Sequence, residues 1–157
     1  SLSVHSVSLL DMASWSGIAI GVQLATWLVL SRVFRPIADF VDVAPLPPPG
    51  PAVTDRAVVT HILASFTGTG APTKQPRTRM EARKLALAIL EQAQGTADWK
   101  ALQLQHNEDG APHTEYPVEK DDSRWDKNFS SGALSLKVGE VGLFETQFGY
   151  HIIKRME

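Results

Sequence analysis

The sequence predicts an α+β fold, a small sheet wrapped by helices, preceded by a hydrophobic N-terminal helix. Three observations predict it: a run rich in β-branched residues at 57–65, a capping box that opens a helix at Thr78, and two strand-like runs joined by a tight turn at 141–154. The chain of 157 residues has the length of one domain with room to spare.

Charge and cysteine usage exclude several classes of function. The net charge of -2 at pH 7 argues against a nucleic-acid partner, because phosphate binding requires a basic face. The sequence contains no cysteine, which excludes disulfide frameworks, thiolate zinc sites and cysteine nucleophiles.

Residues 1–43 are expected to form the hydrophobic N-terminal helix. The stretch 12–31 carries no charged side chain, and a helix of that length would extend about 30 Å, enough to cross a bilayer core. Trp15 and Trp27 would lie near the membrane interfaces. We therefore expect a membrane anchor. The alternatives are a signal segment and a hydrophobic helix that packs on the protein or on a partner.

Residues 44–54 are rich in proline and cannot sustain a helix or a sheet. We expect an extended polyproline spacer that ends one domain and precedes the next, which covers 55–157. A ligand for an SH3-type domain is the alternative interpretation of this segment.

The elements of the second domain follow in order. The strand at 57–65 leads into a loop at 66–76 that contains glycine and proline, and the capped helix then runs from Thr78 to Gly95. A second helix is expected at 97–106.

The C-terminal part continues with a short amphipathic helix around Phe129 and a turn at 137–140. A strand at 141–145, a tight turn at 147–149 and a closing strand at 150–154 complete the chain.

Two segments carry a resemblance to a known family. The ending Thr146-Gln147-Phe148-Gly149-Tyr150-His151-Ile152-Ile153-Lys154 and the first-strand segment Thr60-His61-Ile62-Leu63 resemble parvulin-type peptidyl-prolyl cis/trans isomerases. The helix start at 78–83 and the second helix at 97–102 are similar to the same family. The resemblance implies a parvulin-like small antiparallel sheet wrapped by helices, and isomerisation of X-Pro bonds in unfolded or folding polypeptides.

That reaction sets modest chemical requirements. The obstacle is a rotation barrier of about 18–20 kcal/mol that arises from amide resonance. An enzyme needs an apolar cup for the proline ring and a small polar network, but no nucleophile, metal or cofactor. We therefore expect no cofactor, and proline-containing polypeptides as the partners.

The resemblance implies the members of the polar network. His61 and His151 match two histidines that lie side by side, Thr146 matches the hydroxyl residue bonded to them, and Asp109 matches the residue that faces the substrate imide. Two core histidines that satisfy each other are the structural alternative. For Asp109 the alternatives are that Glu108 takes its place, or that both are solvated loop charges.

The resemblance also implies the members of the cup. Phe129 matches the pocket phenylalanine, and Trp125, four residues earlier, would share its face of a helix. Phe148 matches an aromatic that borders the site. The alternative for Trp125 is a partly exposed aromatic in a loop.

One segment departs from the family pattern. Parvulins carry a glycine-rich GGDLG-like segment where this chain has residues 110–122, so Tyr116 or Val118 is expected to replace the missing pocket residue. The alternative function follows: a catalytically weak or inactive domain that acts as a chaperone or peptide-binding module. In a third hypothesis, the N-terminal helix is the main interaction element.

Two further clusters consist of charged residues, in the second case together with histidines. Lys74, Arg77 and Arg79 stand where the phosphate-directed branch of the family has basic residues, although such a cluster is usually a solvated face. A second cluster fits no standard metal site, so no metal is expected; its members are His106, Glu108, Asp109 and His113.

Localisation is predicted in two ways. Parvulin-like domains on single anchors more often face the bacterial periplasm, which favours an envelope foldase. Arg32 and Arg35 follow the hydrophobic stretch, and the positive-inside rule would instead place the domain at the cytoplasmic face of the membrane.

Overall fold

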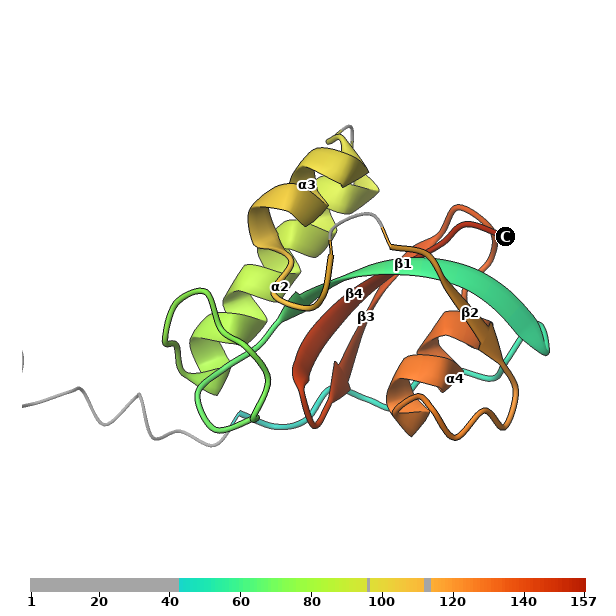
Figure 1. Cartoon of the computed structure of the whole chain (residues 1–157), viewed down its shortest axis with the longest axis horizontal. Coiled ribbons are helices and arrows are strands. Elements are labelled where there is room, and N and C mark those ends of the chain that lie inside the picture. Colours follow the sequence, from blue (N-terminus) through green and yellow to red (C-terminus); the bar gives the residue numbers. More distant parts are fainter. Residues whose placement is uncertain (1–42, 96, 112–113) are drawn as a thin grey trace, which may run out of the picture. The chain divides into compact units, whose positions relative to one another are not determined.

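The computed structural model describes residues 43–95, 97–111 and 114–157, which Figure 1 shows in colour. The expected helix at 12–31 lies outside the described residues. Among the helices that are described, none is long and apolar enough to cross a membrane. In chain order the elements are β1 (Arg56–Ala64), α2 (Arg79–Gln94), α3 (Trp99–His106), β2 (Tyr116–Glu119), α4 (Lys127–Ser135), β3 (Val141–Thr146) and β4 (Gly149–Arg155).

The strands form one four-stranded antiparallel sheet in the order β2-β1-β4-β3. The first and last strands of the domain are therefore the central pair, and Leu63 of β1 lies opposite His151 of β4. This arrangement confirms the expected α+β fold with a small antiparallel sheet. The short edge strand β2 lies in the segment that departs from the family pattern and was not among the expected strands.

Helices cover both faces of the sheet, with α2 and α3 on one face and α4 on the other (Figure 1). Side chains alternate between the faces along each strand. On β1, Ile62 packs with the α2 and α3 residues, whereas Val59 packs with α4. His61 has the same parity as Val59, so its ring faces α4.

Short-range hydrogen bonds start the helices. The capping box of α2 is confirmed: the Glu81 N–H donates to the Thr78 hydroxyl, and the Thr78 N–H donates to the Glu81 carboxylate. Asp126 caps α4 by accepting hydrogen bonds from the N–H groups of Asn128 and Phe129. This cap sets the first turn of α4, and with it the direction of the Phe129 ring.

Residues 44–54 contain no helix or strand, and we call them the strap because they are fastened to the domain. The Leu46 N–H donates to the Glu145 carboxylate at 2.8 Å, and the Val53 N–H donates to the Leu134 carbonyl at 2.9 Å. The Arg83 guanidinium donates to the Ala44 carbonyl. The strap is thus held by α2, β3 and α4.

Candidate active site

Two buried histidines form the centre of the site. His61 on β1 and His151 on β4 are 3% and 5% exposed, and their ring centroids lie 5.3 Å apart in an edge-to-face arrangement. Both side chains face α4, because each has the parity of strand residues that pack with this helix. The expected side-by-side placement is therefore present in the structure.

Thr146 joins this pair from the end of β3. Its hydroxyl oxygen lies 2.9 Å from Nε2 of His151 and also accepts a hydrogen bond from the Phe148 N–H at 3.1 Å. Burial, together with the neighbouring His61, lowers the pKa of His151 to about 3. The His151 ring is consequently neutral at pH 7, and the Thr146 hydroxyl holds its orientation.

Asp109 lies at the open side of the histidine pair. Its Oδ2 is 3.3 Å from Nε2 of His61, and its side chain is 49% exposed. The contact with His61 lowers the pKa of the Asp109 carboxyl by more than partial burial raises it. Asp109 is therefore a carboxylate at neutral pH, with one side toward His61 and the other toward solvent.

Asn107 positions this carboxylate, and the sequence did not reveal it. Its Oδ1 accepts hydrogen bonds from the Leu63 N–H at 2.9 Å and the Asp109 N–H at 3.2 Å, and its amide donates to the Asp109 carbonyl. Asn107 also caps the end of α3. It thereby ties the loop that carries Asp109 to strand β1.

The neighbouring acid, Glu108, points away from the histidines. Its carboxylate, 1% exposed, forms an ion pair with Arg77 at 2.7 Å and accepts hydrogen bonds from Ser65 and the Lys74 N–H. Burial alone would raise the pKa of Glu108, but these hydrogen bonds lower it below its usual value. Of the two adjacent acids, the structure places Asp109 beside His61 and Glu108 in the anchor of loop 66–78.

Phe129 of α4 packs against both histidines. Its ring centroid lies 5.2 Å from that of His61 and 5.2 Å from that of His151, edge-to-face in each case. Trp125 stacks on Phe129 at 5.3 Å. Trp125 is not on the helix as expected, since α4 begins only after its cap at Asp126. The two rings nevertheless meet, because the preceding loop folds Trp125 onto the first turn.

Tyr116 completes the aromatic surroundings of His61. Its ring stacks on His61 at 5.2 Å with an interplanar angle of 17° and meets Trp125 edge-on at 5.5 Å. Tyr116 and Val118 were the two residues expected to replace the missing pocket residue in segment 110–122. Of these two, Tyr116 contacts His61. Val118, in contrast, is fully buried in the core under α4. We call the contiguous rings of His61, Tyr116, Trp125 and Phe129 the aromatic cluster.

Sequence comparison identifies the family. A family model described as "PPIC-type PPIASE domain" matches residues 51–157. The chain belongs to this family. The match covers every strand and helix described above, and it confirms the parvulin-type resemblance of the two end segments. No curated protein sequence matches the chain.

Solved structures share the fold of this PPIase domain. The peptidyl-prolyl isomerase ESS1 from Candida albicans superposes with a TM-score of 0.56 at 21% identity, over 70% of this chain and 67% of that one. The solution structure of TbPIN1 has a TM-score of 0.55 at 21% identity, over 67% of this chain and 100% of that one. The crystal structure of the PPIase domain of TbPar42 has a TM-score of 0.53 at 26% identity, over 64% of this chain and 99% of that one.

Phe148 is more exposed than the rings of the aromatic cluster of this PPIase domain. It stands on the turn between β3 and β4, and its side chain is 42% exposed. Its backbone N–H donates to the Thr146 hydroxyl, which also contacts His151. The residue is thus partly exposed to solvent.

The basic residues near the start of α2 are engaged within the domain. Arg77 pairs with Glu108, and Arg79 pairs with Glu145 at 2.6 Å. The Lys74 ammonium donates to the Gln105 carbonyl. These bonds give the cluster a structural role in fastening loop 66–78 and strand β3, which leaves little of its charge for a phosphate group.

Proposed function

We propose that this PPIase domain isomerises X-Pro bonds in unfolded or folding polypeptides. The observation that carries the proposal is the buried pair of His61 and the neutral His151, held by Thr146 and packed against Phe129, with the Asp109 carboxylate at its open side. Each part is what a rotation without covalent chemistry requires.

The aromatic cluster supplies the apolar wall. Amide resonance makes the planar X-Pro bond more polar than the twisted one, so removal of water and hydrogen-bond donors from the imide favours the twisted state. The half-buried Trp125 ring, backed by the buried Phe129, offers the proline ring an apolar surface next to the uncharged His151 imidazole. An uncharged His151 is essential here, since a buried imidazolium would favour the polar, planar form.

Asp109 adds an electrostatic contribution. In the planar bond the carbonyl oxygen carries extra negative charge from resonance, and this charge decreases as the bond twists. A carboxylate near that oxygen repels the planar state more than the twisted state and thereby lowers the barrier. Asn107 keeps the carboxylate in place.

A second candidate function is that of a peptide-binding or chaperone module. The packing of Tyr116 on His61 favours it, because this ring lies against the face on which a substrate could otherwise stack. Such a domain would hold extended chains through the half-buried rings of Tyr116 and Trp125 without turnover.

The test is a proline-isomerisation assay on the full chain, with peptides that vary in the residue before proline. Phe129→Leu should reduce kcat/KM, whereas Ile89→Val, a similarly small change in the core under α2, should not. Turnover that is absent from folded protein, together with suppression of aggregation of an unfolded client, would favour the binding module.

We further propose that the domain acts as an envelope foldase, anchored to the membrane by its N-terminal stretch and facing the periplasm. The uncharged segment 12–31 and the family resemblance support this. Since the chain has no cysteine, a Lys100→Cys variant provides a single label site on the exposed side of α3. A membrane-impermeant maleimide should label it when it has access to the periplasm alone. Labelling only after lysis would indicate the cytoplasmic face.

A further inference from the structure

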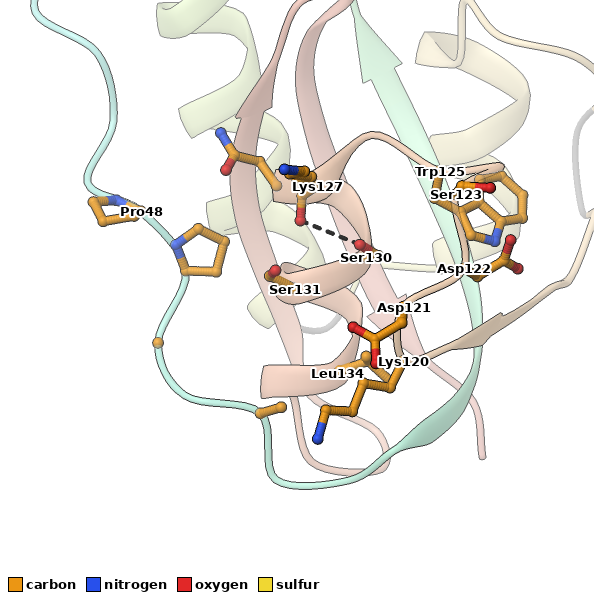
Figure 2. A pocket seen from close by; sticks show the side chains of 14 residues that line it. Pro48, Lys120, Asp121, Asp122, Ser123, Trp125, Lys127, Ser130, Ser131 and Leu134 are labelled. Carbon is orange, nitrogen blue, oxygen red and sulfur yellow. Dashed lines mark hydrogen bonds between the residues drawn. The ribbon is translucent and has the colours of Figure 1, made fainter.

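A hollow of about 690 Å³ lies over the exposed side of α4 (Figure 2). The strap forms one wall with Pro48 and Pro49, α4 forms the floor with Ser131 and Leu134, and the loop after β2 forms the opposite wall, which includes Trp125. A volume of this size is within the range of pockets that bind small ligands or short peptide segments.

Trp125 belongs to both the hollow and the aromatic cluster. It lines the hollow, and its ring also stacks on Phe129 at 5.3 Å, beside the histidine pair. One face of the Trp125 ring thus covers the buried Phe129, which is 3% exposed, while the same residue lines the hollow. The hollow therefore adjoins the site proposed above through Trp125.

The lining has the chemistry of a binding surface for an extended polypeptide. Prolines, Leu134 and Trp125 offer apolar contact for side chains, and Ser130 and Ser131 offer hydroxyl groups for a peptide backbone. The charged residues of the lining balance each other; they are Lys120, Lys127, Asp121 and Asp122. A neutral chain fits this balance better than a phosphate or a nucleic acid does.

The strap wall is held in place on both sides of the hollow. Leu46 is bonded to Glu145 before Pro48, and Val53 is bonded to Leu134 after Pro49. A wall fixed in advance loses little conformational entropy when a ligand binds. Residues 48–50 of this wall precede the stretch 51–157 that matches the family model.

We propose that the hollow binds the residues of the client polypeptide that flank the isomerised proline. The hollow then acts as a subsite that favours extended chains over short peptides. The inference rests on the proposed function, because it takes the aromatic cluster as the place where the proline binds.

The test compares a four-residue proline peptide with versions extended by apolar and neutral residues on either side. In the full wild-type chain, extension on one side should lower KM by about tenfold. Ser131→Gln, which places a longer neutral side chain at an exposed position of α4, should abolish this gain and leave the short peptide unaffected. Ala101→Gln at an exposed position of α3, on the other face of the sheet, is the matched control and should keep the gain.

Two results would overturn the inference: neither extension lowers KM, or the gain survives Ser131→Gln in protein of unchanged melting temperature. If the short peptide is not turned over at all, the proposed function fails instead. The hollow can then still be tested by NMR, since an extended peptide should shift the amide signals of Gly50 and Ser131, and unshifted signals at both would refute the subsite.

Discussion

The two faces of the sheet are built from different kinds of side chain. Under α2 and α3 the core is mainly aliphatic, and the buried Gln103 amide donates to the Thr60 hydroxyl and the His61 carbonyl. Under α4 the same two central strands present His61 and His151. Within the described part of the chain, Nδ1 of both rings has no hydrogen-bond partner, and Nε2 of His61 has only the 3.3 Å contact with Asp109. On the α2–α3 face, the Trp99 Nε1 atom is likewise without a partner.

The difference shows how the domain divides stability and function. A buried polar atom without a partner costs about 1–3 kcal/mol, so the α4 face gives up stability to keep the histidine pair beside an aromatic wall. The aliphatic face offsets this cost, because each fully buried aliphatic side chain contributes about 1.5–3 kcal/mol. Strands β1 and β4 join the faces, so substitutions matched across the sheet can separate the two roles.

The largest effects are expected from removal of one large side chain on each face. Ile89→Ala should lower the free energy of unfolding by about 2–5 kcal/mol and Phe129→Ala by about 3–5 kcal/mol, because both residues are buried. Only Phe129→Ala should also reduce kcat/KM of the folded fraction, by about 30-fold to 100-fold, since the proline ring loses its wall. Chemical denaturation and a peptide assay measure the two effects. Equal kcat/KM for both variants would contradict the division of stability and function between the two faces of the sheet.

Acid should destabilise the α4 face through His151. Its pKa is lowered from 6.5 to about 3 in the folded protein, so the unfolded chain binds one more proton between these values. The contribution of the His151 ring to the free energy of unfolding is complete above pH 6.5. It decreases as the pH falls, by about 3 kcal/mol at pH 4.5. Denaturation from pH 7 to pH 4.5 measures this loss.

Other groups contribute to acid sensitivity in separable ways. Glu108 and Asp109 also have lowered pKa values, but their loss begins only near their ordinary values of 4.5 and 3.8. His106, whose pKa is lowered by burial, also reduces the stability of the fold as the pH falls below the ordinary histidine pKa. The variant His106→Gln removes this contribution and so separates it from that of His151. An NMR titration in which the His151 ring becomes charged near pH 6.5 would contradict the prediction.

Thr146→Val and Thr60→Val each remove one buried hydroxyl, the first on the α4 face of the sheet and the second on the α2–α3 face. Both hydroxyls are buried hydrogen-bond partners, of His151 and Gln103 respectively, so each variant should lose about 1–3 kcal/mol of unfolding free energy. Only Thr146→Val releases the His151 ring and should reduce kcat/KM. A rate that is the same in both variants would show that the ring orientation does not affect turnover.

The smallest effect on stability is expected from Asp109→Asn, because the side chain is half exposed. The free energy of unfolding should change by no more than about 0.5 kcal/mol. The rate of isomerisation should nevertheless fall about tenfold, since the electrostatic contribution of the carboxylate is lost. Thermal melting and the peptide assay are the measurements. Unchanged turnover would exclude this role for Asp109, and absent turnover in the wild type would favour the binding module.

Much of the fold and part of the site could be predicted from local sequence. The capping box at Thr78, the β-branched run around His61 and the tight turn before His151 each determine structure over a few residues. Tyr116 and Asn107 could not be assigned in this way. Tyr116 lies on a strand of four residues that includes a proline, and Asn107 acts through contacts to residues distant in sequence.

By itself, the sequence determined most of the helices and strands, β2 excepted, and which alternate residues share a face, because backbone preferences and side-chain periodicity are local properties. The tertiary structure decided which side chains meet. The register of β2 on β1 sets Tyr116 opposite Val59 and so brings its ring to His61, whereas Val118 lies opposite Ala57. The bonds of Asn107 turn Asp109 toward His61, while Glu108 turns to Arg77. Such choices depend on pairing and burial between distant segments, which a local pattern does not contain.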